Sequence, residues 1–330
     1  MPRPRAIRSL AVALLALAVA VSSAGCAPAG GWELTGDTAT HDPALAKAGR
    51  TWFVYSTGSG TIGDGGIQIR SSADGRAWTY EGEVWDEKPE WLTDQIKGVD
   101  NLWAPELVEH DGTWYLYYSA STFGKNTSVI ALATNTTLDP DDPDYEWVDQ
   151  GPVVASTSAD DFNAIDPGVV TDEDGTPWMA FGSFWSGIRM VELSWPSGTR
   201  ADAAEPLRLA DRGFPPNAVE APYLVQHDGD WFLFVSFDSC CQGADSTYKI
   251  AVGRADAVTG PFLDRDGVPL SDGGGTVLLE TDGAHVGPGG QSAAEGMLAY
   301  HWYDADQGGR FGLGLSPIRW DSEGWPQLSW

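Results

Sequence analysis

The sequence predicts an all-β fold, and within that class a five-bladed β-propeller. Three observations lead to this prediction: short runs rich in aromatic and β-branched residues, Asp-Gly turns between them, and a unit that recurs about every sixty residues. The clearest runs are residues 52–55, 114–118 and 231–235, whose composition is typical of strands. No long stretch shows the 3.6-residue period of an amphipathic helix. The Asp-Gly turns lie at residues 74–75, 111–112, 174–175 and 228–229.

The recurring unit determines the expected number of blades. Each copy starts with a residue followed by Pro, continues through a short apolar strand and a polar turn, and ends in an aromatic strand. The prolines lie 62, 62, 55 and 66 residues apart, a period typical of propeller blades built from several short strands. A β-sandwich with coincidental hairpins is the poorer alternative, because Pro and aromatic strand recur together. The prolines are Pro43, Pro105, Pro167, Pro222 and, in a weaker fifth copy, Pro288.

Composition excludes two classes of protein. The chain has 330 residues, with 47 Asp and Glu against 19 Lys and Arg, so its formal net charge is −28. Such a chain repels phosphate backbones, and no basic stripe offsets the charge, so no nucleic-acid partner is expected. With 42% apolar residues and 16 Trp, the bulk of the chain can bury a core and is not intrinsically disordered.

The N-terminus has the pattern of an export signal. Three Arg precede an apolar run from Leu10 to Val21, and small residues lead into Cys26. This run is too short to span a bilayer. The approach to Cys26 resembles a bacterial lipobox, so we expect a cell-surface lipoprotein whose only link to the membrane is a lipid on Cys26. The alternative is an ordinary signal peptide and a secreted protein. The predicted organisation is a lipoprotein-type signal peptide (1–25), a short linker (26–31) and the propeller (32–330).

Only two other cysteines remain, Cys240 and Cys241. In a strand, neighbouring side chains point to opposite faces, and adjacent Cα atoms lie closer than is usual for a disulfide. The expectation is therefore two packed thiols, with a vicinal disulfide as the alternative.

Carboxylates stand at the starts of three repeats: Asp42, Asp166 and Glu220. If the repeat starts are the innermost strands of the blades, these residues meet at the central channel. Charges are costly to bury at such positions, which favours a functional role. Glycoside hydrolysis needs two carboxyl groups across the scissile bond, and a third can tune the acid by like-charge repulsion. A metal site built from the same acids is the rival interpretation.

An ordered set of motifs resembles glycoside hydrolase family 43, from about Trp32 to the C-terminus. The family motifs are residues 41–43 (His-Asp-Pro), 101–106 (Asn-Leu-Trp-Ala-Pro-Glu), 163–167 (Asn-Ala-Ile-Asp-Pro), 182–187 (Gly-Ser-Phe-Trp-Ser-Gly) and 219–223 (Val-Glu-Ala-Pro-Tyr). Residues 121–124 (Ser-Thr-Phe-Gly), 240–243 (Cys-Cys-Gln-Gly) and 246–250 (Ser-Thr-Tyr-Lys-Ile) resemble its α-1,5-L-arabinanases.

The resemblance implies a role for each acid. Asp42 corresponds to the general base that activates water, Glu220 to the general acid, and Asp166 to the residue that raises the pKa of Glu220 and orients it. The family inverts anomeric configuration, which requires the base and the acid to lie about 6.5–9.5 Å apart. The implied substrate is arabinan or its oligosaccharides, cleaved at internal bonds, and the expected protein is a monomer.

The resemblance also implies substrate-binding residues. Stacking on sugar faces is expected from Trp103, Phe123, Phe184 and Trp185. The other expected substrate-binding residues are Gly124, Asn163, Ala164, Ile165 and Ser183.

His301 matches the family position that binds a channel metal, usually calcium, and no organic cofactor is expected. His41 is expected to orient the base beside it. One segment departs from the family pattern, because Gly290-Gln291 stands where His-Asn is usual.

Three other functions remain open. An exo-acting arabinofuranosidase or a β-xylosidase of the same family would carry the same acids. A surface lipoprotein that binds arabinan without cutting it, or a retaining five-bladed hydrolase acting on fructans, would share the fold.

Overall fold

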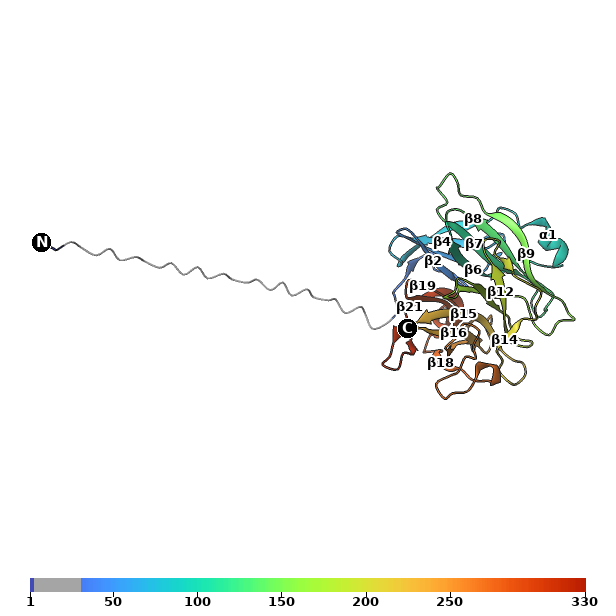
Figure 1. Cartoon of the computed structure of the whole chain (residues 1–330). Helices are drawn as coiled ribbons and strands as arrows, with labels where there is room; N and C mark the ends of the chain where they lie inside the picture. Colours follow the sequence, from blue (N-terminus) through green and yellow to red (C-terminus); the bar gives the residue numbers. More distant parts are fainter. Residues whose placement is uncertain (3–30) are drawn as a thin grey trace.

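The computed structural model describes residues 1–2 and 31–330. The predicted signal peptide and linker lie outside the described residues, apart from Met1, Pro2 and Gly31. Five sheets form a ring, so the predicted five-bladed β-propeller is confirmed (Figure 1). Across residues 31–330, none of the helices has the length and apolar character needed to cross a membrane.

Each blade is a sheet of sequential antiparallel strands, joined in blade 1 by a parallel edge strand. Blade 1 contains β1 (Thr35–Gly36), β2 (Ala44–Ala48), β3 (Thr51–Ser56), β4 (Gln68–Ser72) and β5 (Ala77–Glu83). Blade 2 contains β6 (Leu102–His110), β7 (Thr113–Ala120), β8 (Ser128–Asn135) and β9 (Val148–Ser156). Blade 3 contains β10 (Gly168–Thr171), β11 (Pro177–Phe181), β12 (Ile188–Ser194), β13 (Thr199–Arg200) and β14 (Leu207–Ala210). Blade 4 contains β15 (Val219–His227), β16 (Asp230–Phe237), β17 (Lys249–Ala255) and β18 (Thr276–Leu279). Blade 5 contains β19 (His285–Ala294), β20 (Met297–Asp304) and β21 (Arg310–Pro317).

Short elements complete the fold. They are α1 (Glu90–Gln95), the 3₁₀ turns η1 (Gly243–Asp245), η2 (Leu270–Asp272) and η3 (Ala305–Gln307), and the hairpin of β22 (Arg319–Trp320) and β23 (Pro326–Gln327).

The aromatic runs form the second strand of the blades and are buried on both faces. Tyr117 and Tyr118 are adjacent in β7, so their side chains point to opposite faces of the sheet. Both are fully buried, Tyr118 against blade 1 and Tyr117 against blade 3. The apolar cores therefore lie between blades, which explains why these strands are continuously apolar rather than alternating.

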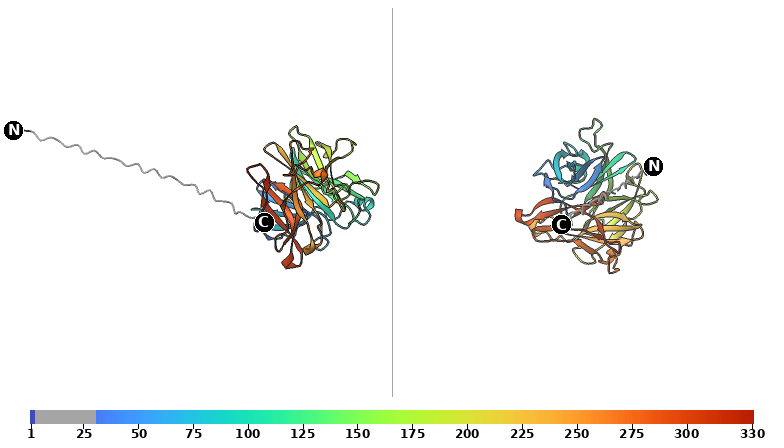
Figure 2. Two further views of the ribbon diagram at one scale, coloured as in Figure 1. Left: turned by 90° about the horizontal axis from the view of Figure 1, so that it is seen from below. Right: turned by 90° about the vertical axis from the view of Figure 1, so that its left-hand side faces the viewer.

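The innermost strands close a ring around the axis. In order, β2, β6, β10, β15 and β19 contact one another, and β19 returns to β2. Figure 1 shows four of them near the middle of the fold. The N-terminal segment joins blade 1 to blade 5: Trp32 N donates to Leu315 O in β21, Leu313 N donates to Thr38 O, and β1 pairs with β5. The views in Figure 2 show the blades packed into one body.

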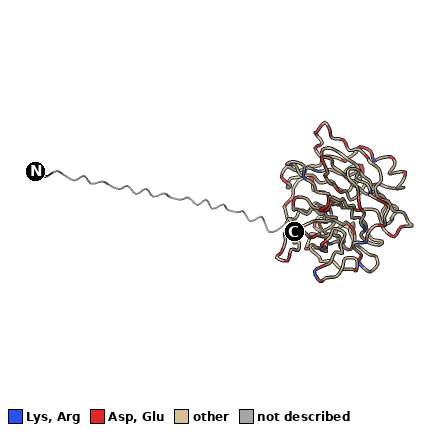
Figure 3. Tube along the Cα trace, viewed as in Figure 1, with Lys and Arg blue, Asp and Glu red and all other residues tan. Residues whose placement is uncertain are grey.

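The acidic residues are spread over the whole propeller. Figure 3 shows Asp and Glu on loops around its circumference as well as near its middle, with Lys and Arg scattered among them. The net negative charge is therefore a property of the surface in general, and it does not by itself locate a site.

The start of each innermost strand shares one backbone feature. Four residues that precede a repeat Pro have positive φ: Asp42 (49°), Ala104 (39°), Asp166 (59°) and Ala221 (50°). In blade 5 the equivalent residue is Gly290, with φ of 59°, and Gln291 follows in place of Pro. The fifth repeat therefore aligns at Gly290-Gln291, and its assignment to Gly287-Pro288 is wrong by three residues.

The expectation of two packed thiols is also wrong, because Cys240 and Cys241 form a disulfide. Both residues lie in the loop after β16 rather than in a strand, and Cys241 has φ of 67°. The alternation of side chains along a strand, on which the expectation rested, does not apply in this loop.

Candidate active site

A cleft of about 880 Å³ opens over the starts of the innermost strands. It contains nearly all the residues predicted for the site, although they are spread over four blades and about 180 residues of sequence. The predicted residues that line it are Asp42, Trp103, Phe123, Gly124, Asn163, Ile165, Asp166, Ser183, Phe184, Trp185 and Glu220.

Two predicted residues lie elsewhere. Ala164 is fully buried and packs in the core between blades 2 and 3, so its side chain does not reach a ligand in the cleft. Its N–H donates to Ser156 Oγ, which gives it a structural role instead. His301 is also fully buried, and it lies against Asp42.

Few side chains crowd the axis at the strand starts. Of the five equivalent positions, only Asp42 and Asp166 carry polar side chains; the others are Ala or Gly. A Cβ at Gly290 would lie 2.4 Å from Asp42 Oδ1 and 2.8 Å from His301 Nδ1. The absence of a side chain at Gly290 therefore leaves the space that Asp42 and His301 occupy.

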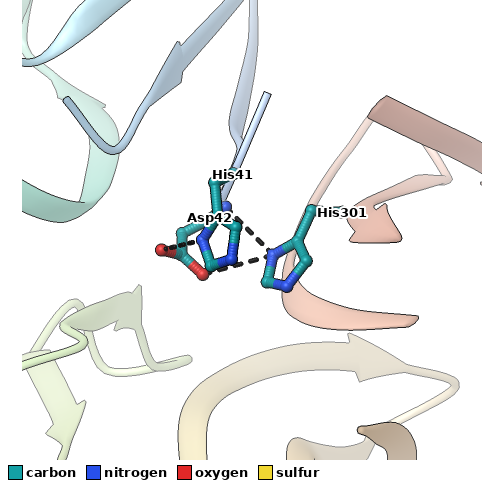
Figure 4. Close-up of side chains that lie close together, drawn as sticks. All are labelled: His41, Asp42 and His301. Atoms are coloured by element: carbon teal, nitrogen blue, oxygen red, sulfur yellow. Dashed lines mark hydrogen bonds and ion pairs between the residues drawn. The ribbon is translucent and has the colours of Figure 1, made fainter. Parts of the chain in front are cut away.

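Asp42 is held by three side chains, of which Figure 4 shows His41 and His301. Its Oδ2 accepts from Thr57 Oγ1 at 2.7 Å and lies 2.8 Å from His41 Nδ1. Its Oδ1 lies 3.3 Å from His301 Nδ1. Burial raises the pKa of Asp42, but the charge that His41 can carry and the side-chain contacts with His301 and His41 together lower it well below the ordinary value. Asp42 is therefore an ionised carboxylate, the form that a base requires.

Glu220 lies in the opposite kind of environment. It is buried at 8% exposure, and its two oxygens accept from Ser183 Oγ and Tyr248 OH, each at 2.6 Å. Burial raises the pKa of Glu220, the two hydrogen bonds lower it, and the charge on Asp42 raises it; the net effect is upward. Two carboxyl groups in one cleft with pKa values moved in opposite directions are the arrangement that separates an acid from a base.

Asp166 is coupled to Glu220. Its Oδ2 accepts from Ala221 N at 3.1 Å, directly beside Glu220 in the chain. Burial and then the charges of Glu220 and Asp42 raise the pKa of Asp166 well above the ordinary value. Because this repulsion is reciprocal, the Asp166–Glu220 pair holds a proton at a higher pH than an isolated carboxyl group would.

One polar residue per blade lies in the second half of the second strand or just after it: Thr57, Ser119, Ser183, Ser236 and His301. Most of them accept a hydrogen bond from the positive-φ residue of the next blade. Ala104 N donates to Thr57 Oγ1, Asp166 N to Ser119 Oγ, and Gly290 N to Ser236 Oγ. Asp42 N donates to His301 Nδ1 at 3.1 Å, so an imidazole occupies the place of a hydroxyl. This set fixes the strand starts that carry the carboxylates.

Two aromatic residues of the cleft are exposed and two, Trp103 and Phe184, are half-buried, so their rings are accessible for stacking on a ligand. Phe123 is 83% exposed and Trp185 is 40% exposed. Phe184 and Trp185 both have positive φ, an uncommon conformation for large side chains. Asn217 Nδ2 donates to Trp185 O at 2.8 Å and supports this turn.

The group of His41, Asp42 and His301 is also the candidate metal centre. One ligand atom from each lies within 4.8 Å of the others. Burial lowers the pKa of His301 to about 4, so its imidazole is neutral near neutral pH, the form that binds metals. Its Nε2 makes only a 3.5 Å contact with Tyr303 OH. Calcium prefers oxygen ligands and this group offers a single carboxylate, so a calcium ion held here would take most of its shell from water.

Three residues that contact the acids or their neighbours were not predicted from sequence: Thr57, Tyr248 and Tyr303. Tyr248 lies within the Ser-Thr-Tyr-Lys-Ile motif, which was a usable signal. Thr57 could have been found from its repeat position. Tyr303 carries no such signal, because its contact with His41 spans 262 residues.

Comparison with known proteins places the chain in a family. The family model described as "Glycosyl hydrolases family 43" matches residues 35–326. The extracellular endo-α-(1→5)-L-arabinanase 1 of Bacillus subtilis is 39% identical over 316 residues, covering 95% of each chain. The extracellular exo-α-(1→5)-L-arabinofuranosidase ArbA of Cellvibrio japonicus is 37% identical, covering 87% of this chain and 86% of its own. The solved endo-arabinanase of Bacillus licheniformis is 40% identical with a TM-score of 0.84, over 90% of this chain and 99% of that one.

Proposed function

The chain belongs to glycosyl hydrolase family 43, and from this membership we propose that it is an inverting endo-α-1,5-L-arabinanase. The observation that carries the proposal is one cleft containing an ionised Asp42 and a Glu220 with raised pKa. The similarity to relatives named as arabinanases supports the substrate class.

The proposed reaction is a single displacement. The carboxylate of Asp42 takes a proton from a water molecule, whose oxygen attacks the anomeric carbon. The bond from that carbon to the glycosidic oxygen breaks, and Glu220 gives its proton to the departing oxygen. Asp42 is left protonated and Glu220 ionised, and exchange with solvent restores both. The carboxylate is held in place for this step, because Oδ2 contacts His41 and Thr57 and Oδ1 lies 3.3 Å from His301 Nδ1.

Digestion of linear arabinan with a product time course tests this proposal. An endo enzyme produces a ladder of oligosaccharides early, and ¹H NMR detects the inverted anomer first. Exo action is the second candidate, because the Cellvibrio relative named as an exo-enzyme has similar identity; it would release one short product from the start. Binding without hydrolysis would favour the non-catalytic alternative, and a retained anomer would exclude inversion.

Asp166→Asn is expected to shift the pH dependence of activity. Asp166 and Glu220 repel each other when both are ionised, so removal of the Asp166 carboxylate is expected to lower the pH at which the last proton leaves this pair. Glu220 then loses its proton at lower pH. The fall of kcat/KM on the alkaline side of the pH profile is therefore expected to shift about one pH unit lower. The carbonyl oxygen of the new amide can still accept the hydrogen bond from Ala221 N. Asp100→Asn, at an exposed carboxylate of the same cleft, is the control. An unmoved or alkaline-shifted limb in Asp166→Asn contradicts the role of Asp166.

We also propose that His301 binds a calcium ion. When bound, the ion supplies positive charge beside Asp42. Purified protein is expected to contain about one calcium per chain by elemental analysis, and His301→Ala to lose it. The matched control is His285→Ala, because His285 belongs to the same blade but is exposed and stacks on Trp330. Equal calcium content in both variants would reject His301 as the ligand.

Export is proposed from the N-terminal pattern, and two relatives named as extracellular support it. Lipid attachment at Cys26 is tested by comparing the membrane fraction of cells that express the chain with that of cells expressing Cys26→Ala. A protein that stays in the membrane fraction after the substitution would reject the lipid anchor.

A further inference from the structure

The loop that carries the disulfide forms part of the cleft wall. Cys240 and Cys241 both line the cleft. The loop is closed on itself: Thr247 N donates to Ser239 O at 2.9 Å, and Gln242 N donates to Ser246 Oγ at 3.0 Å. The disulfide is therefore part of a compact turn fixed to the ends of β16 and β17.

A continuous chain of short contacts leads from this loop to Asp42. Cys241 N donates to Tyr303 OH at 2.9 Å; a backbone N–H can only donate, so the phenol oxygen accepts. Tyr303 OH lies 2.7 Å from His41 Nε2. His41 Nδ1 in turn lies 2.8 Å from Asp42 Oδ2. Every contact in the chain is within hydrogen-bond range and joins residues from blades 1, 4 and 5.

The disulfide also packs against the histidine directly. Cys241 Sγ lies 4.0 Å from His41 Nε2. The ring of His301 also constrains His41, because the two rings stack with their centroids 3.6 Å apart. His41 is thus held by a stacked ring, a phenol and a sulfur atom, so its orientation depends on all three.

We propose that Tyr303 is a positioning residue for the reaction, and that the Cys240–Cys241 disulfide holds the loop that fixes it. Tyr303 orients His41, and His41 orients the carboxylate of Asp42 toward the attacking water. This inference rests on the proposed role of Asp42 as base. Loss of the phenol hydroxyl leaves Asp42 charged but less well oriented. The poorer orientation lowers the rate of the chemical step more than it weakens substrate binding.

Tyr303→Phe tests the first part, with Tyr300→Phe as matched control. Tyr300 is a buried tyrosine of the same strand whose ring packs against Trp330 instead. For Tyr303→Phe, kcat on arabino-oligosaccharides is expected to fall about tenfold or more with KM nearly unchanged. Tyr300→Phe should leave both close to the unsubstituted protein. An unchanged kcat, or a loss confined to KM, overturns the positioning role.

A spectroscopic readout separates this inference from the proposed function. In protein labelled with ¹⁵N-histidine, Tyr303→Phe is expected to move the His41 Nε2 resonance more than those of the other four histidines. This shift requires no substrate, so it holds even if arabinan is not cleaved. Unmoved His41 resonances would overturn the contact, whatever the activity on arabinan.

The disulfide is tested through its coupling to Tyr303. Replacement of Cys240 and Cys241 together by Ala is expected to lower kcat in the unsubstituted protein but to add little loss in Tyr303→Phe, because both changes break one chain. Reduction with a phosphine, followed by thiol titration, provides the same comparison if the double variant does not fold. If removal of the disulfide lowers kcat by the same factor in the unsubstituted protein and in Tyr303→Phe, the disulfide acts independently of Tyr303. That result would overturn the proposed role of the disulfide.

Discussion

Glu220→Gln is expected to lower kcat on linear arabinan by about 10²–10⁴-fold, the range typical for loss of a general acid. Gln keeps the size of the side chain but has no proton to give to the departing sugar oxygen. The fold should be retained. In the unsubstituted protein the hydroxyls of Ser183 and Tyr248 donate to the carboxyl oxygens of Glu220, and in the variant a hydroxyl can instead accept from the amide group of Gln. Circular dichroism and the melting temperature check the fold, and initial rates check the activity.

The leaving group provides a sharper test of the acid. A substrate that releases a nitrophenolate needs little proton assistance, so Glu220→Gln is expected to retain far more of its activity on that substrate than on arabinan. Ser183→Ala is a matched control, because it removes a hydrogen bond to Glu220 but leaves the carboxyl group. Full activity of Glu220→Gln on arabinan, or an equal loss on both substrates, would remove Glu220 from the role of acid.

The fold was predictable because its repeat carries a local signature. A buried second strand needs continuous aromatic and apolar residues, and the start of each innermost strand has an unusual backbone that recurs before Pro. The fifth repeat was misaligned because Gln291 stands where the other repeats have Pro, and the nearby Pro288 matches the pattern of the repeat instead. The parallel pairing of β1 with β5 left no sequence signal, because residues 35–36 form a pair too short to show a pattern.

The site was predictable in its carboxylates and less so in their partners. Asp42, Asp166 and Glu220 lie at repeat starts, and a propeller brings such positions together. The residues that contact these acids come from second strands and from loops. From the sequence alone, neither the direction of their side chains nor the blade that each one contacts can be predicted. Tyr303 and the disulfide reach His41 from other blades, and only three-dimensional packing shows these contacts.

Asp42→Asn is expected to reduce kcat by about 10²–10⁴-fold on arabinan and on the nitrophenolate substrate alike. The base acts on water, and its contribution does not depend on the quality of the leaving group. This pattern distinguishes it from Glu220→Gln, whose loss depends on the leaving group. Asn is close in size to Asp and keeps a carbonyl oxygen that can accept from Thr57 Oγ1, so the loss reflects the missing negative charge.

Rescue by an external anion completes the test of the base. Asp42→Gly leaves space where the carboxylate stood, and Gly tolerates the φ of 49° at this position. Formate is expected to restore part of the lost rate, with saturation, because a small carboxylate in that space can again take the proton from water. The matched control is Asp100→Gly, which removes an exposed carboxylate from the same cleft and should neither lose activity strongly nor respond to formate. Because the attack by water comes from the face opposite the leaving group, the product of the rescued reaction must still have the inverted configuration. Retained activity in Asp42→Asn, or a rescued product of retained configuration, would mean that another group activates the water.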